Sequence, residues 1–400
     1  MSRWSIVLLG GLLAAGVARA SSDDAASREP RATMGEIFHA LSEVLPASLD
    51  EGRFADPAQR GAILTALTKL AAAGSKLEAH GRSRDAGFGF LSRSLARDTE
   101  EIRRRYADGR SEEARFLLHE VTQDCVACHS RLPSQHDASL GRRLMSEARV
   151  AALPLDERAR LEFATRQFER ALETNEALLA SPDYSASDLD LTGVLDEYLE
   201  LCLRVRRDFE RPARALERFA ARAEVPERLR VRVGRWVTSL REIAGRKRAA
   251  TPLAEANALL AVAQDRARFP DERDALVYDL AASGELHRFT DATAPGPDVA
   301  LAFFQLGEIE SRVGRSFWLS QTEVYFETSI RMAPGEPFAP QALAQLREFL
   351  VSGYTGSGGR QVPADVQMRL AELRDLVERA RAPAPDAPAP ARQVEPPAAR

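Results

Sequence analysis

Five residues in the first third of the chain, Cys125-Val126-Ala127-Cys128-His129, constrain its structure most strongly. They spell C-x-x-C-H, the attachment motif for a covalently bound c-type haem. On a helix, two thiols three positions apart lie about one turn from each other, so both can form thioethers with one porphyrin while the adjacent imidazole reaches the iron. The sequence therefore predicts one haem c, attached to Cys125 and Cys128, with His129 as the proximal iron ligand.

The motif also admits a zinc site or a redox dithiol. A zinc site needs two more Cys or His ligands at close spacing, and only His119 and His136 lie nearby. A thioredoxin-like dithiol needs a βαβ context, and the surrounding sequence has no strand pattern. Haem attachment consumes two of the three cysteines, which leaves Cys202 in an apolar stretch that predicts a buried, inert thiol.

The N-terminal 20 residues read as a secretory signal peptide. Arg3 precedes an apolar stretch over 6–17, and Ala18-Arg19-Ala20 forms a small-residue cleavage site. The apolar stretch is shorter than the roughly 20 residues that cross a bilayer, so no membrane span is expected after cleavage. We therefore expect a periplasmic or otherwise exported protein, with residues 21–32 as a polar linker.

Four amphipathic helices are predicted between residues 33 and 133. The first is expected to end at Pro46 and Ser48-Leu49-Asp50, the second to begin at Asp56-Pro57, and the third to run over 85–106. The fourth opens at Ser111 and closes at Pro133. Its apolar face is expected to hold Ala114, Leu117, Val121, Cys125 and Cys128, which directs the haem edge into the core of a four-helix bundle and leaves His119 off that face.

With the C-x-x-C-H motif near the end of the fourth helix, residues 33–133 resemble cytochrome c′ and its low-spin relatives, the class II c-type cytochromes. The resemblance implies a distal haem side covered by the first helix, which carries an apolar side chain or a Met there. Met34 lies on the core face of the first helix and His39 nearly opposite it. Met34 is therefore the candidate distal ligand, with simple core packing equally open, and His39 is expected in solvent.

The remainder of the chain, from 138 to 381, is predicted to be a second, all-helical domain, followed by a disordered Pro- and Ala-rich tail over 382–400. Amphipathic helices with short breaks are expected over 155–179, 189–205, 226–243, 253–266 and 271–286. Residues 299–334 resemble a tetratricopeptide repeat through Gln305-Leu306-Gly307 and Tyr325-Phe326, which implies a surface that binds protein. A plain helical domain that packs on the haem bundle is the alternative.

Together these features predict an all-α fold, a haem-binding four-helix bundle followed by a tetratricopeptide-like domain, and an electron-transfer protein that docks to a redox partner. The alternative is a sensor of gas or redox state with an open distal site. The net charge of −4 argues against a nucleic-acid partner, and a homodimer is left open. No acid–base pair for peroxide cleavage is recognisable, so an enzyme is the less expected class, with weak peroxidase activity left open. A fragment of residues 21–134 is expected to fold and hold haem by itself.

Overall fold

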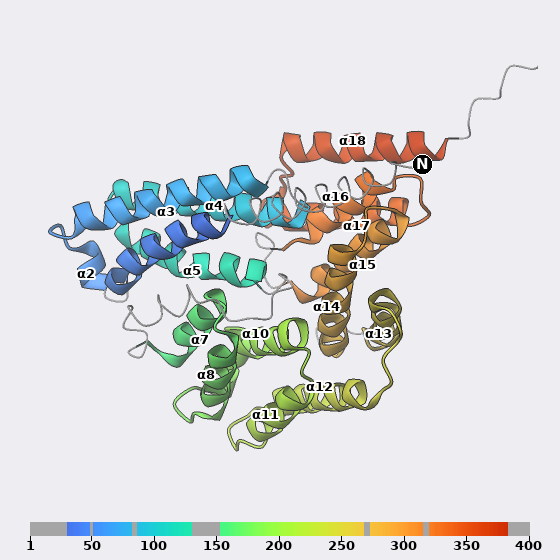
Figure 1. Cartoon of the computed structure of the whole chain (residues 1–400), viewed down its shortest axis with the longest axis horizontal. Helices are drawn as coiled ribbons and strands as arrows, with labels where there is room; N and C mark the ends of the chain where they lie inside the picture. The colour runs from blue at the N-terminus through green and yellow to red at the C-terminus, as the bar shows by residue number, and fades with distance from the viewer. Residues whose placement is uncertain are drawn as a thin grey trace, which may run out of the picture.

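A computed structural model describes residues 30–48, 51–81, 86–129, 153–267, 273–314 and 320–382. These residues are almost entirely helical, which confirms the all-α class (Figure 1). In these ranges the strands are confined to a small antiparallel hairpin, β1 (Thr355–Gly356) and β2 (Gly359–Arg360). None of the described helices is both long enough and apolar enough to cross a membrane. The predicted signal peptide, the predicted tail from 383 onward, Pro133 and His136 lie outside the described residues.

The N-terminal helices lie side by side in alternating directions (Figure 1). Two ion pairs fix the register of the first helix against the helix that follows: Lys69 Nζ lies 2.9 Å from Glu43 Oε2, and Lys76 Nζ lies 2.7 Å from Glu36 Oε2. From Glu36 to Glu43 the residue number rises along the first helix, whereas that of the lysine partner falls from 76 to 69. The two helices are therefore antiparallel. The helices of this region are the helix of residues 30–48, α2 (Glu51–Ala55), α3 (Arg60–Gly81), α4 (Ala86–Ala107) and α5 (Ser111–His129).

One helix boundary differs from the prediction. The first helix is described through Ser48, within the expected end at Pro46 and Ser48-Leu49-Asp50. Asp56-Pro57 does not start α3. Instead Asp56 Oδ1 accepts a hydrogen bond from the backbone N–H of Ala58 at 2.9 Å, which forms a turn ahead of the helix.

The N-terminal core is formed by one face of each of these helices. At Gly74 of α3 an added Cβ would lie 2.7 Å from Thr99 Oγ1 and 3.2 Å from the Cα of Ala96, so α3 and α4 approach each other more closely than a larger residue allows. The large buried members of this core are Ile37, Leu41, Val44, Phe54, Leu67, Leu70, Ile102, Tyr106, Leu118 and Val121.

The second helical region is built largely of antiparallel helix pairs. Figure 1 shows α7–α12 as an arc below the N-terminal helices, α13 and α14 beside that arc, α15–α17 above α14, and α18 along the top. The elements are α7 (Leu155–Ala164), α8 (Phe168–Ala180), α9 (Ala186–Leu191), α10 (Val194–Glu200), the π-helical turn η2 (Leu201–Arg206), α11 (Glu210–Ala220), α12 (Glu227–Gly245), α13 (Pro252–Arg266), α14 (Leu276–Ala292), α15 (Pro297–Val313), α16 (Thr322–Met332), α17 (Ala339–Gly353) and α18 (Ala364–Arg381).

The helical stretch predicted over 155–179 is divided into two helices. The chain leaves α7 at Thr165, passes through Arg166 with a left-handed φ of 60°, and restarts as α8 at Phe168. The helix predicted over 189–205 is likewise interrupted, because Gly193 has a φ of 83° and separates α9 from α10. Both breaks rest on left-handed residues, and only the second carries the glycine that favours this conformation.

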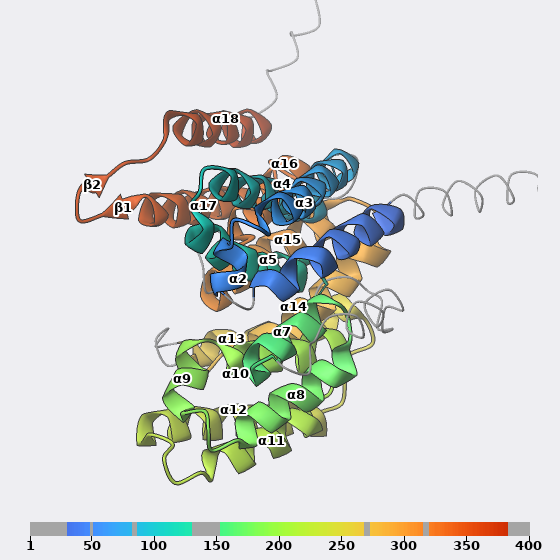
Figure 2. The same ribbon diagram turned by 90° about the vertical axis from the view of Figure 1, so that its left-hand side faces the viewer.

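Two further cores lie in this region. The central core is formed by α7–α15 and includes Phe163, Phe168, Tyr198, Leu203, Phe219, Trp236, Val277 and Leu306. The C-terminal core is formed by α15–α18 and includes Phe304, Phe326, Leu346, Leu350 and Leu373. Figure 2 shows the N-terminal helices stacked above the arc that surrounds the central core. The side chains cross this boundary, because Leu161 of α7 belongs to the N-terminal core and Val126 of α5 to the central core.

Candidate functional site

The last turn of α5 holds the C-x-x-C-H residues, and its histidine is buried. The His129 side chain has its Nδ1 2.6 Å from the carbonyl oxygen of Ala164, to which the ring N–H donates. Burial, together with the positive charge of Arg166, lowers the pKa of His129 to about 4. The ring is therefore neutral at physiological pH, with its proton on Nδ1 and a lone pair on Nε2.

The break between α7 and α8 supplies the partner of this histidine. Ala164 is the last residue of α7, and the last four carbonyl groups of a helix have no partner inside it. Because the chain turns away at Arg166, the carbonyl of Ala164 is available to His129. A continuous helix over 155–179 would have engaged that carbonyl with the backbone N–H of Phe168.

The two motif cysteines are half-buried and reduced. The thiol of Cys125 donates to the carbonyl oxygen of Val121 at 3.5 Å, and its side chain packs against the central core. Burial, followed by the nearby Asp124 and Cys128, raises the pKa of the Cys125 thiol to about 12. A thiol held in its protonated form is a poor thiolate nucleophile and a poor zinc ligand, so the environment does not favour a redox dithiol.

A buried carboxyl lies directly before the motif. Asp124 of α5 is 4% exposed, faces Asp98 of α4, and leaves its Oδ1 without a hydrogen-bond partner. Burial, then the charge of Asp98 and a hydrogen bond with it, raises the pKa of Asp124 to about 8, against the opposing effect of Arg97. Asp98 accepts a hydrogen bond from Arg97 Nε at 2.9 Å.

The structure differs from the predicted apolar face of α5 in three respects. Leu118 is fully buried whereas Leu117 is only half-buried, because α5 packs against both α4 and α7 and its buried stripe spans two neighbours. The packing of Cys125 on the central core also differs from the expectation that the motif faces the core of the bundle. His119, expected off the buried face, is half-buried, with Nε2 3.3 Å from Ser48 Oγ.

Met34 is half-buried and packs against the N-terminal core. The contact of His119 with Ser48 places the end of the first helix beside the middle of α5. Because the first helix is antiparallel to α3, α3 to α4, and α4 to α5, Met34 at its start lies toward the same end as Cys125 and His129. His39 is exposed, as predicted, and pairs with Glu43 at 3.2 Å.

The residues present fit a covalent haem. The thiols of Cys125 and Cys128 lie one turn apart on α5, and the adjacent imidazole is neutral. Metal-bound histidines commonly donate their second ring N–H to a carbonyl or carboxylate, which is the bond that His129 makes with Ala164. Both the C-x-x-C-H motif and the hydrogen bond from His129 to Ala164 therefore fit a haem-binding histidine.

Sequence reasoning missed two contributors to this site. Ala164 acts through its backbone, and Thr165-Arg166-Gln167 contains no Gly, Pro or Asn that would have marked the helix break. Asp124 could have been noticed, because a carboxyl on the buried side of an amphipathic helix conflicts with its pattern.

Within the described ranges no three His, Cys, Asp or Glu side chains gather as ligands for a metal ion. The chain was also compared with protein-family models, with curated proteins and with solved structures. None of the three comparisons gives a match to this chain.

Proposed function

We propose that this chain is an exported monohaem c-type cytochrome, in which residues 33–133 form a four-helix bundle of the cytochrome c′ type that carries one haem c. Its function would be electron transfer with a redox-partner protein. The observation that carries the proposal is the hydrogen bond from His129 Nδ1, at the end of the C-x-x-C-H motif, to the carbonyl oxygen of Ala164. Because Nδ1 carries the proton, Nε2 is the ring nitrogen of His129 that has a lone pair for a metal.

Each residue has a defined task in this proposal. Cys125 and Cys128 hold the porphyrin through thioethers, and His129 binds the iron through Nε2. When bound, haem supplies a one-electron ferric–ferrous couple. Ala164 fixes the orientation and tautomer of the imidazole, which sets how strongly it donates to the metal.

The helical region that follows would provide the docking surface. Gly307 of α15 lies against the ring of Phe326 of α16, where an added Cβ would be 2.6 Å from the ring. This close helix pair is the part of the chain that resembles a tetratricopeptide repeat, and stacked pairs of this kind present surfaces that bind proteins. The export signal proposed for residues 1–20 would place both partners outside the cytoplasm.

A second candidate function is gas binding or redox sensing at an open distal side. The packing of the two key side chains favours it: Met34 packs on the N-terminal core, whereas Cys125 packs on the central core. If Met34 remains in the core, the sixth position of the iron is free for a small ligand such as NO or CO.

An optical spectrum of the exported, matured protein tests both functions. We expect the pyridine haemochrome of a haem with two thioether bonds. A far-red iron–methionine charge-transfer band would support electron transfer with Met34 as ligand. High-spin bands and CO binding would support the second function, and a preparation without haem would contradict both.

A further inference from the structure

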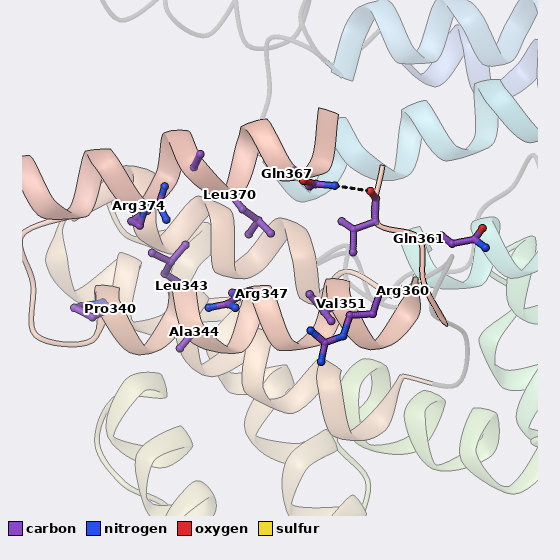
Figure 3. A pocket seen from close by; sticks show the side chains of 12 residues that line it. Pro340, Leu343, Ala344, Arg347, Val351, Arg360, Gln361, Gln367, Leu370 and Arg374 are labelled. Carbon is purple, nitrogen blue, oxygen red and sulfur yellow. Dashed lines mark hydrogen bonds between the residues drawn. The ribbon is translucent and has the colours of Figure 1, made fainter. Parts of the chain in front are cut away.

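A groove of about 720 Å³ separates α17 from α18 beside β2 (Figure 3). Its apolar part is supplied by half-buried side chains of both helices, among them Leu343 and Val351 of α17 and Leu370 of α18. At one end Gln367 Nε2 donates to the carbonyl oxygen of Val362 at 2.8 Å, which ties the start of α18 to the segment after the hairpin.

The charged side chains along this groove are all positive. Arg347, Arg360 and Arg374 line it, and no lining residue is acidic. Among the described residues Arg347 and Arg360 have no carboxylate within ion-pair distance, and the nearest one to Arg374 is Asp375, with Nε 3.9 Å from Oδ1.

The arginines between α16 and α18, by contrast, are paired with carboxylates. Arg331 of α16 has its Nη1 2.8 Å from Glu372 Oε1, and Arg369 of α18 pairs with Glu323. The fold therefore satisfies the arginines between α16 and α18 and leaves those along the groove exposed.

The arginines are distributed along the groove and do not converge on one point. Figure 3 shows Arg374 and Arg360 toward opposite ends, with Arg347 between them and apolar side chains alongside. They come from three elements: α17, β2 and α18. A single phosphate or sulfate would be bound by converging guanidinium groups. This spacing matches a linear ligand with several carboxylates and intervening apolar side chains.

We propose that the groove binds an acidic, amphipathic segment of a partner protein. Its apolar side chains would contact Leu343, Val351 and Leu370, and its carboxylates would pair with Arg347, Arg360 and Arg374. The complementarity of charge commits the groove to an acidic occupant. The groove contains none of the haem-motif residues, so binding of the acidic segment does not depend on haem.

Binding is measured by fluorescence anisotropy with the full-length protein and a labelled peptide of about 12 residues, in which Glu and Leu occupy adjoining faces of a helix. The combined Arg347→Gln, Arg360→Gln and Arg374→Gln variant should weaken binding about tenfold, because it removes three charge pairs at the rim of the groove. Replacing the same three arginines by Lys should preserve most of the affinity. Because all three side chains are exposed, these changes should leave the fold intact.

The matched control removes the same charge elsewhere through Arg218→Gln, Arg379→Gln and Arg381→Gln, which are exposed positions outside the groove. This control should bind the peptide with unchanged affinity. Equal weakening by both triple variants, or equal binding of a peptide with Gln in place of every Glu, would overturn the proposal. So would tighter binding after removal of residues 383–400, because the groove would then belong to the chain's own Asp386 and Glu395.

Discussion

The two ends of α5 are embedded in different parts of the molecule. The first end contributes Ala114, Leu118 and Val121 to the N-terminal core. The second end contributes Val126 to the central core and holds His129 against Ala164 of α7. One helix thus begins in the region that resembles a cytochrome bundle and ends in the region that follows it. The candidate haem site is therefore shared between the two regions, and the second region shapes the surroundings of His129.

The largest expected effect comes from the cysteines at the second end of α5. Cys125→Ala or Cys128→Ala should leave at most one thioether bond, with a shifted pyridine haemochrome spectrum, and the double variant should lose covalent haem. The matched control is Cys202→Ala, because Cys202 is fully buried in the central core and far from the motif in sequence. Unaltered spectra in both single variants would remove haem attachment from this motif.

The next effect tests whether the N-terminal helices and the second helical region unfold as one cooperative unit. Leu161 of α7 is 7% exposed and belongs to the N-terminal core, although it lies beyond the predicted domain boundary. Leu161→Ala should lower the free energy of unfolding by about 2–5 kcal/mol, because it removes buried methyl groups and leaves a cavity. Leu191→Ala, at a position 76% exposed, should change it by less than about 0.5 kcal/mol.

Chemical denaturation followed by circular dichroism measures both variants. We expect one cooperative transition, since α5 and α7 each contribute to both cores. Two separate transitions, neither of them shifted by Leu161→Ala, would show that the N-terminal helices unfold independently of the second helical region. The expectation that residues 21–134 fold alone remains a prediction, and the absence of Leu161 and Ala164 from that fragment is the physical argument against it.

The pH dependence of stability reports on the carboxyl pair at the second end of α5. The folded protein holds the proton of Asp124 up to a pKa of about 8, whereas an unfolded carboxyl releases it near its ordinary value of 3.8. The contribution of protonated Asp124 to the free energy of unfolding is therefore fully present below the unfolded pKa of 3.8, and it is lost as the pH rises toward 8. The slope is at most about 1.4 kcal/mol per pH unit.

Asp124→Asn should flatten this dependence between about pH 4 and pH 8. Thermal unfolding of both proteins across that range gives the comparison. Identical pH profiles would mean that Asp124 is ionised in the folded protein and that its partner is not Asp98.

The helices could be predicted largely from the sequence, but the site only in part. Apolar periodicity predicts amphipathic helices where α3 and α4 lie, and one face of each is buried, for example at Ile63, Leu67, Leu91 and Ile102. The break at Arg166 left no such pattern, since Arg seldom adopts a left-handed conformation and only tertiary contacts hold it there. The bond from His129 to Ala164 depends on that break, so it could not be derived before the fold was known.

The smallest expected effect on the fold comes from Met34. Met34→Leu conserves volume, so the free energy of unfolding should change by less than about 1.5 kcal/mol. The spectrum is the informative measurement. If Met34 reaches the iron, the variant becomes high-spin and gains CO binding, because leucine offers no sulfur ligand. His39→Ala is the control, and its exposed, Glu43-paired side chain predicts no spectral change. An unchanged spin state and CO affinity in Met34→Leu would assign Met34 to the N-terminal core alone, and would mean that the protein's own first helix leaves the distal side open.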